Sequence, residues 1–314
     1  MSPDNTTPLP YRGRFAPSPT GALHFGSLVA ALGSYLDARS QRGQWLLRME
    51  DLDRTREVKG AADAILRSLD AFGFEWDGPV CYQRHRSEAY AEALDRLLQE
   101  GQAYACSCSR KQIAQAAPVG DEGPIYPGTC RTRHLQARHA RSIRLLTRDE
   151  EIAFHDRIQG PARQNIGREI GDFVIRRADG FHAYQLAVVV DDAWQGITRV
   201  VRGADLLMST PRQCHLQQVL GLTRPEYAHL PLAVDAAGRK LSKQHGDAPV
   251  DPRRPLNALM QALAFLHQPL PPDRPVSLDE FWAWGVKNWS LSAIPAQPRL
   301  PIAPLGHSHA DHQE

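Results

Sequence analysis

The stretch RFAPSPTGALHFGS, residues 14–27, places two prolines, a histidine and several small residues between a short strand and a helix. Pro17 and Pro19 cannot donate hydrogen bonds to a strand ladder, and they stiffen the turn that follows. Gly21 and Gly26 leave the backbone open to close approach where the helix begins. Free amide groups at a helix N-terminus bind anions, so this turn predicts a phosphate site. The alternative is an ordinary strand–turn–helix corner without a ligand.

A second stretch, GRKLSKQHG at residues 238–246, has two glycines around a loop with three cationic side chains. Arg239, Lys240 and Lys243 supply the charge, and Ser242 supplies a hydroxyl group. Such a loop can close over a polyphosphate and neutralise the charge that develops when phosphorus is attacked. Lysine suits this role because it is a compact charge on a long stem. The alternative is a solvated basic loop.

Three of the five cysteines lie close together in the sequence. Cys106, Cys108 and Cys130 could hold a tetrahedral zinc ion as thiolates, and a fourth ligand would be needed. His134 is the conventional candidate for that ligand. The alternative is three free cysteines without a metal. The first ten residues do not resemble a signal peptide, so the odd number of cysteines argues for a reducing cytoplasm and against a disulfide framework.

The elements around these stretches alternate between strands and helices. Residues 44–53, QWLLRMEDLD, have the pattern of a buried strand that ends in acidic residues, among them Glu50. Apolar residues at helical spacing predict helices over three segments: 58–72, 87–99 and 210–220. Strand-like apolar runs fill 171–203, a further strand is expected near 228–234, and a Trp-rich helix is expected at 281–289. This alternation predicts an α/β fold with a parallel sheet and right-handed crossovers.

The composition is that of a globular protein with a sizeable core. A chain of 314 residues that is 42% hydrophobic suggests two domains, or one domain with a large insertion that begins near residue 104. No run of about 18 apolar residues is present, so we expect no membrane span. The net charge of +2 neither indicates nor excludes a nucleic-acid partner. Residues 131–148, however, carry many arginines and no acid, which is typical of a solvated helical face or of a nucleic-acid contact.

Together, the two candidate phosphate stretches resemble a known signature. PSPTGALHFGS resembles the HIGH motif of class I aminoacyl-tRNA synthetases, and KLSKQ resembles their KMSKS loop. RFAPSPTGALHFGS followed by RMEDLDRTR is similar to the glutamyl branch, and the resemblance runs from Tyr11 to His245. The HIGH motif reads HFGS at residues 24–27, so a serine stands where the generic motif has its second histidine.

This resemblance implies a Rossmann-type class I synthetase catalytic core, with an inserted zinc-stapled acceptor subdomain and a short helical C-terminal part. The implied divisions are a disordered tail at 1–10, the first half of the core at 11–103, the inserted subdomain at 104–171, the second half with the KMSKS-like loop at 172–248, a helical region at 249–298 and a tail at 299–314. The resemblance also implies Tyr126 as the fourth ligand of one structural zinc, beside Cys106, Cys108 and Cys130.

The glutamyl branch also implies roles for single residues in glutamate binding. Arg14 would clamp the side-chain carboxylate of glutamate as a bidentate fork, and Glu50 would accept its α-ammonium group. The implied glutamate contacts further include Ala16, Ser18, Tyr184 and Arg202. A second arginine favours glutamate over glutamine, because an amide would leave a buried positive charge poorly matched. For each residue alone, a structural salt bridge is the competing interpretation.

An ATP site is implied in the same way. His24 would hydrogen-bond the phosphates and Lys243 would touch the α-phosphate side, so these two are the expected catalytic residues. The implied ATP contacts are His24, Gly26, Lys240, Ser242 and Lys243. No protein nucleophile is needed, because the carboxylate of the amino acid itself attacks the α-phosphorus. Mg²⁺ that enters with ATP would shield the leaving pyrophosphate.

Seventy residues follow Gln244 in this 314-residue chain, too few for the helical anticodon-reading domain of a glutamyl-tRNA synthetase. A catalytic core of this kind resembles the glutamyl-queuosine tRNA(Asp) synthetase family. That resemblance implies tRNA-independent, ATP-dependent activation of L-glutamate and its transfer to the queuosine base at the wobble position of tRNA(Asp). We expect a cytoplasmic monomer whose partners are ATP, L-glutamate and queuosine-modified tRNA(Asp). The alternatives are a truncated glutamyl-tRNA synthetase that charges a tRNA 3′ end, and an inactive relic that binds nucleotide or RNA.

Overall fold

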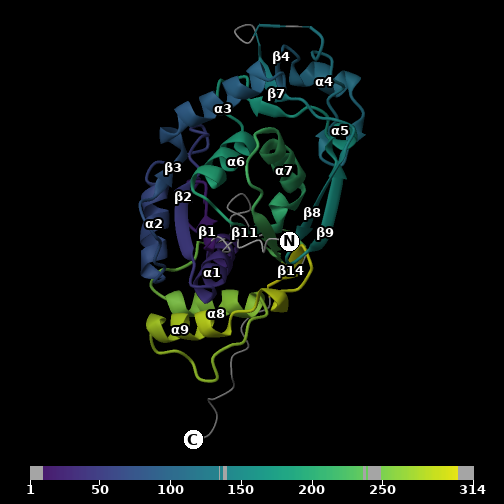
Figure 1. Cartoon of the computed structure of the whole chain (residues 1–314). Coiled ribbons are helices and arrows are strands. Elements are labelled where there is room, and N and C mark those ends of the chain that lie inside the picture. Colours follow the sequence, from purple (N-terminus) through teal and green to yellow (C-terminus); the bar gives the residue numbers. More distant parts are fainter. Residues whose placement is uncertain (1–9, 134, 137–139, 236–237, 240–248, 303–314) are drawn as a thin grey trace, which may run out of the picture.

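The computed structural model describes residues 10–133, 135–136, 140–235, 238–239 and 249–302. At its centre lie two sets of parallel strands, drawn in Figure 1. The strands are β1 (Arg12–Phe15), β2 (Gln44–Met49), β3 (Cys81–Tyr82), β11 (Arg199–Gly203) and β12 (Glu226–Leu230). β2 pairs in parallel with β1 and β3, and β11 pairs in parallel with β12. The sets meet where the Thr198 amide donates to the Arg12 carbonyl at 2.9 Å. The predicted α/β fold with a parallel sheet is confirmed.

Five helices accompany these strands. They are α1 (Phe25–Ser40), α2 (Ala61–Ala71), α3 (Ser87–Gln99), α6 (Tyr184–Trp194) and α7 (Thr210–Val219). α2, α3 and α7 lie within the three segments in which helical spacing predicts them, so those predictions are confirmed. The strong amphipathic patterns of α2 and α3 explain this agreement, because only one face of each helix is buried.

The apolar run that precedes residue 195 is helix α6, so the prediction of strand there is wrong. The run includes three consecutive valines, Val188 to Val190, a residue type that favours strands. Most side chains of α6 are buried, including those of two adjacent aspartates, Asp191 and Asp192. A helix buried on most sides has no apolar stripe, and periodicity alone therefore cannot distinguish it from a buried strand.

The segment between α3 and α6 forms a second sheet and a long hairpin, seen at the top and right of Figure 1. Its strands are β4 (Ala103–Cys106), β5 (Val119–Gly120), β6 (Gly123–Pro124), β7 (Ser142–Leu145), β8 (Glu151–Asp156), β9 (Gly160–Asn165) and β10 (Val174–Arg176), and its helices are α4 (Arg110–Ala116) and α5 (Ile166–Glu169). β7 pairs antiparallel with β4 and β10, while β8 and β9 form the hairpin. β8 also pairs with β12 through Asp156 and Tyr227, so this segment is joined to the central strands.

The C-terminal part is built from helices α8 (Pro255–Phe265) and α9 (Leu278–Asn288), together with β13 (Leu232–Val234) and β14 (Arg299–Pro301). α9 confirms the predicted Trp-rich helix, and both helices lie below α1 in Figure 1. A Cβ atom added to Gly285 would lie 3.1 Å from Leu36 Cδ2, so α9 approaches α1 closely. The Trp289 indole and the Arg199 guanidinium both donate to the buried Asp37 carboxylate, at 3.2 and 3.1 Å.

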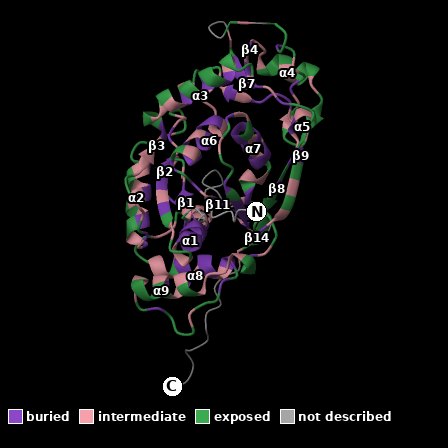
Figure 2. Ribbon diagram, in the orientation of Figure 1, coloured by how far each residue is buried: buried purple, intermediate pink, exposed green. Residues whose placement is uncertain are grey.

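Helix α1 occupies the middle of the larger apolar cluster. Figure 2 shows it as predominantly buried, and nine of its side chains between Leu28 and Ala38, together with Gly33, are buried. The apolar side chains that pack against α1 come from the strands on one side and from α8 and α9 on the other. Among the described residues, no helix is long and apolar enough to cross a membrane.

Candidate active site

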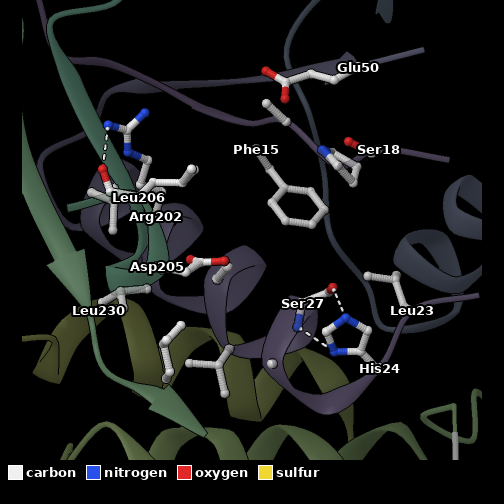
Figure 3. Close-up of a pocket in the computed structure, with 18 of the residues that line it drawn as sticks. Phe15, Ser18, Leu23, His24, Ser27, Glu50, Arg202, Asp205, Leu206 and Leu230 are labelled. Atoms are coloured by element: carbon white, nitrogen blue, oxygen red, sulfur yellow. Dashed lines mark hydrogen bonds between the residues drawn. The ribbon is translucent and has the colours of Figure 1, made fainter. Parts of the chain in front are cut away.

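A cavity of about 620 Å³ opens at the carboxyl ends of β1, β2 and β11 (Figure 3). Open α/β sheets bind ligands at such edges. The cavity brings together the described residues that sequence reasoning proposed for glutamate and ATP: Arg14, Ala16, Ser18, His24, Gly26, Glu50, Tyr184 and Arg202. These residues come from β1, the turn after β1, the start of α1, the end of β2, α6 and β11.

A buried network of opposite charges lies behind one side of the cavity, and Arg14 and Glu50 are its members in the cavity lining. Arg14 is 3% exposed and its Nε donates to Asp192 Oδ1 at 3.1 Å, while its Nη2 lies 3.4 Å from Asp192 Oδ2. Arg48 is fully buried and binds the same carboxylate at 2.8 Å and Glu50 at 3.5 Å. Asp192 therefore holds the Nε–Nη2 edge of the Arg14 guanidinium, and a substrate carboxylate would meet the remaining N–H groups of Arg14.

Glu50 lies at the other end of this network and on the cavity wall. Burial raises the pKa of Glu50, whereas the positive charges of Arg48 and Arg14 act to lower it. A buried carboxylate in this position gains stability as an anion when a cation enters beside it. The α-ammonium group of an amino acid is such a cation, so the electrostatics of Glu50 fit the proposed role.

Arg202 reaches the cavity from β11, and fixed acceptors surround its guanidinium. Its Nε donates to His229 Nε2 at 3.0 Å, and its Nη2 donates to Thr210 Oγ1 at 2.9 Å and to the Leu206 carbonyl at 3.4 Å. Nη1 lies 3.5 Å from the Tyr184 hydroxyl. Burial raises the pKa of Tyr184 to about 12, so this hydroxyl stays protonated at neutral pH and can donate to a substrate oxygen. Arg202 and Glu50 lie on different sides of the cavity in Figure 3.

The start of α1 forms the floor of the cavity. His24 is the N-cap residue, and its Nδ1 accepts from the Ser27 amide at 3.3 Å while its Nε2 lies 3.1 Å from Ser27 Oγ. The first turn of α1, all of which is described, carries no acidic residue. The partial positive charge of the helix N-terminus is therefore available to an anion in the cavity.

A second cluster lies between β4, α4 and the loop that precedes β7. The sulfur atoms of Cys106, Cys108 and Cys130 all lie within 4.8 Å of one another. The Tyr126 hydroxyl lies 3.3 Å from the Cys106 sulfur and 3.7 Å from the Cys108 sulfur. The guanidinium of Arg144 donates to the Cys106 sulfur at 3.3 Å and stacks 3.8 Å above the Tyr126 ring.

This cluster fits a structural zinc ion. Burial acts to raise the pKa of the Cys130 thiol, but hydrogen bonds from Ser107, Tyr126 and Cys108 lower it to about 6, which favours one of the thiolates that zinc requires. Burial raises the pKa of the Cys108 thiol. Arg144 supplies a positive charge that compensates the negative charge of such a ligand set. The Tyr126 hydroxyl lies beside two of the sulfur atoms, and its role as the fourth ligand remains a prediction; His134, the conventional alternative, lies outside the described residues.

Comparison with known proteins identifies the family. The sequence profile of the class I tRNA synthetases (E and Q), catalytic domain, matches residues 11–255. A protein of Chromobacterium violaceum named glutamyl-Q tRNA(Asp) synthetase is 58% identical over 93% of this chain and 98% of its own length. A protein of the same name from Dechloromonas aromatica is 60% identical over 92% of this chain and 97% of its own length. This chain belongs to the glutamyl-Q tRNA(Asp) synthetase family. The predicted family is confirmed.

Structural comparison agrees with this assignment. A glutamate-tRNA synthetase from Elizabethkingia anophelis superposes with a TM-score of 0.78 at 26% identity, over 94% of this chain and 68% of that one. A methionyl-tRNA synthetase from Mycobacterium tuberculosis shares the fold, with a TM-score of 0.51 at 12% identity. The predicted class I synthetase catalytic fold is confirmed.

The KMSKS-like loop lies outside the described residues, so the roles expected of Lys240, Ser242 and Lys243 remain predictions. Arg239, at the edge of that loop, is described, and its guanidinium binds Asp235 at 2.8 Å.

The basic run at 131–148 is not a helical face in its described part. Residues 142–145 form β7, and Arg144 is buried against the cysteine cluster. Arg131 forms an ion pair with Asp172 at 2.6 Å. Two of the arginines therefore have structural partners, which sequence reasoning did not predict. A strand-like apolar alternation, Ile143 and Leu145, is the signal in the sequence that identifies β7.

Sequence reasoning also missed Arg48, Asp192 and His229, which all contact proposed site residues. Each stands within an apolar run: WLLRM, VVVDDAW and AHLPL. A charged or polar residue inside a run that must be buried needs a buried partner. This signal finds such residues from the sequence, although it does not identify their partners.

Replacing Cys130 by serine is expected to lower both zinc content and thermal stability, because a structural zinc site contributes directly to folding. The purified parent protein is expected to contain about one zinc per chain. Metal analysis and a thermal melt measure the two effects. Cys81→Ser is the matched control, since Cys81 is half-buried and is not part of the cluster. Metal-free parent protein with undiminished stability would contradict the zinc assignment.

Proposed function

We propose that this protein activates L-glutamate with ATP in the absence of tRNA, and transfers the glutamyl group to queuosine in the anticodon of tRNA(Asp). The observation that carries the proposal is the presence of one carboxylate, that of Glu50, and two guanidinium groups, those of Arg14 and Arg202, in the lining of one cavity. Glu50 complements the α-ammonium group of glutamate, and Arg14 and Arg202 complement its side-chain carboxylate. The relatives named glutamyl-Q tRNA(Asp) synthetase support the choice of acceptor.

The first step needs positioning and charge stabilisation. The α-carboxylate of glutamate attacks the α-phosphorus of ATP, the bond to the β-phosphate oxygen breaks, and pyrophosphate leaves with its Mg²⁺. The start of α1 with His24 would hold the phosphates, and Lys240, Ser242 and Lys243 would close over them. Charge that develops on the phosphoryl oxygens is then stabilised by donors already in place.

In the second step a hydroxyl of the cyclopentenediol of queuosine attacks the carbonyl carbon of the adenylate. An ester forms, AMP leaves, and the hydroxyl proton passes to solvent or to the leaving phosphate. The acceptor would reach the cavity beside Glu50 and Tyr184, where a smaller cavity adjoins the main one. The zinc cluster would stiffen the inserted segment that faces the RNA. We expect the enzyme to work as a cytoplasmic monomer.

Exchange of labelled pyrophosphate into ATP, measured with glutamate and without RNA, tests the first step. We expect exchange at an undiminished rate when tRNA is omitted, because every residue proposed for glutamate and ATP lies within one catalytic core. Exchange that appears only after tRNA is added would contradict tRNA-independent activation.

Transfer of labelled glutamate to RNA tests the acceptor. A queuosine-containing anticodon stem-loop of tRNA(Asp) has no 3′ acceptor end, and we expect it to be labelled. The same stem-loop with guanosine in place of queuosine is the control. Prior periodate oxidation cleaves the vicinal diol and should abolish labelling. Labelling of full-length tRNA at its 3′ end, with the stem-loop unlabelled, would instead favour an ordinary glutamyl-tRNA synthetase.

A further inference from the structure

Three buried residues from three different strands form a line that ends at the cavity. Asp156 ends β8, His229 lies on β12 and Arg202 lies on β11. The strand register places Arg202 beside His229, and it places Asp156 beside Tyr227. Asp156 and His229 are fully buried and Arg202 is 5% exposed.

The chemistry of arginine fixes the direction of every hydrogen bond in this line. Arg202 Nε can only donate, so His229 Nε2 must be the unprotonated nitrogen that accepts at 3.0 Å. The proton of the neutral ring therefore resides on Nδ1, which donates to Asp156 Oδ2 at 2.6 Å. Burial lowers the pKa of His229 to about 4, which keeps the ring neutral at physiological pH.

The backbone holds Asp156 in turn. Its Oδ1 accepts from the amides of Ile158, Gln159 and His229 at 3.0, 2.8 and 3.1 Å. These bonds keep the carboxylate ionised and leave Oδ2 for the histidine ring. Asp156, which is not in the cavity lining, thus orients the Nε side of the Arg202 guanidinium, while Thr210 and the Leu206 carbonyl hold Nη2.

We propose that Asp156 and His229 are positioning residues that hold Arg202 in the orientation in which it selects a carboxylate side chain. Asp156 belongs to the β8–β9 hairpin, so this segment contributes to amino-acid selection as well as to any contact with RNA. The inference rests on the proposed activation of glutamate and deepens it. In this arrangement the Nη1 group of Arg202, beside Tyr184, is the donor that faces the substrate.

Asp156→Asn is the most informative variant because it changes one oxygen to an NH₂ group. An amide nitrogen facing His229 Nδ1 would force the ring proton to Nε2, where it would oppose the Arg202 Nε–H. We expect the KM for glutamate in tRNA-free pyrophosphate exchange to rise about tenfold or more, as for loss of a hydrogen bond to a charged group. The preference for glutamate over glutamine should fall, and the KM for ATP should stay within about twofold.

Asp172→Asn is the matched control. Asp172 is also fully buried and also precedes α6, but it binds Arg131 and the Thr147 amide rather than a residue of the cavity. We expect this variant to lose thermal stability while its KM for glutamate stays unchanged. An equal rise of the KM for glutamate in both variants would show a general structural effect and would overturn the proposal.

A double-mutant cycle tests whether Asp156 acts through Arg202. If it does, Asp156→Asn should raise the KM for glutamate much less in an Arg202→Lys background, because the group that it positions is already gone. Fully additive effects would overturn the proposal.

His229→Gln and His229→Leu keep the test decisive if Asp156→Asn does not fold. The glutamine amide oxygen can still accept from Arg202 Nε, so this variant should retain more glutamate affinity than the leucine variant. A folded leucine variant with the parent KM for glutamate would overturn the proposal. Absence of glutamate-dependent exchange in the parent protein would instead refute the proposed function itself.

Discussion

Glutamine is expected to be activated at least about a thousandfold less efficiently than glutamate. Two buried guanidinium groups, those of Arg14 and Arg202, line the cavity, and both are proposed to face the side chain of the amino acid. A carboxylate matches their charge, whereas an amide offers one acceptor and an NH₂ group that faces N–H donors. Asp192 already pairs with Arg14, so an amide would leave the charge of Arg202 poorly matched, because Arg202 donates to neutral groups. A poorly matched buried charge costs several kcal/mol. The ratio of kcat/KM for the two amino acids in pyrophosphate exchange measures the discrimination.

Arg14→Lys is expected to remove most of the activity with which the protein activates glutamate. A lysine keeps the charge, but its ammonium group cannot bind both oxygens of Asp192 and still present planar N–H donors to the substrate. Arg12→Lys is the matched control: Arg12 lies two residues earlier on β1 and binds Gln44 and the Gln195 carbonyl, outside the cavity lining. An Arg14→Lys variant that activates glutamate nearly as well as the parent would exclude Arg14 as the carboxylate clamp.

Lys243→Ala is expected to slow adenylate formation about a hundredfold or more, with little change in glutamate affinity. The hundredfold decrease in rate is the effect expected when one hydrogen-bond donor that stabilises the transition state is lost. The prediction rests on the place of Lys243 in the KMSKS-like sequence KLSKQ. Single-turnover adenylate formation measures the rate, and the KM for glutamate measures affinity.

Lys287→Ala provides the control for Lys243→Ala, because Lys287 is an exposed lysine in the last turn of α9. It should leave both quantities unchanged. A mild effect of Lys243→Ala on the rate, or an equal loss of glutamate affinity, would favour a solvated loop without catalytic function.

The parts of the fold that could be predicted are those in which one face of an element is buried. α3 spans Ser87–Gln99, the predicted range, because its apolar residues recur at helical spacing and its other face is polar. α6 was predicted as strand because burial on most sides erases that periodicity and its valines favour strands. Local sequence therefore specified the half-exposed helices α2 and α3 better than α6.

The residues of the candidate site also differ in how well the sequence predicts them. Residues that carry the chemistry, such as Arg14 and Glu50, are recognisable by type and by their place at strand ends. Their partners are not, since Asp192 is 178 residues from Arg14 in the chain and reaches it only after α6 packs beside β1. The positions of Asp156 and His229 likewise depend on the pairing of β8 with β12, which no local pattern specifies.

The burial of α1 affects how the protein should respond to salt. Apolar side chains surround this helix along most of its length, so little water or salt can approach its backbone. Mobile ions screen exposed charges over about 10 Å at 0.1 M salt but act far less on buried ones. The first turn, at residues 25–27, is half-buried on the cavity, so salt should screen the electric field at the N-terminus of α1 less than it screens fully exposed charges. Added salt should then weaken the binding of ATP less than it weakens the attraction between the RNA and exposed arginines. A suitable salt concentration would therefore reduce RNA binding while ATP binding persists.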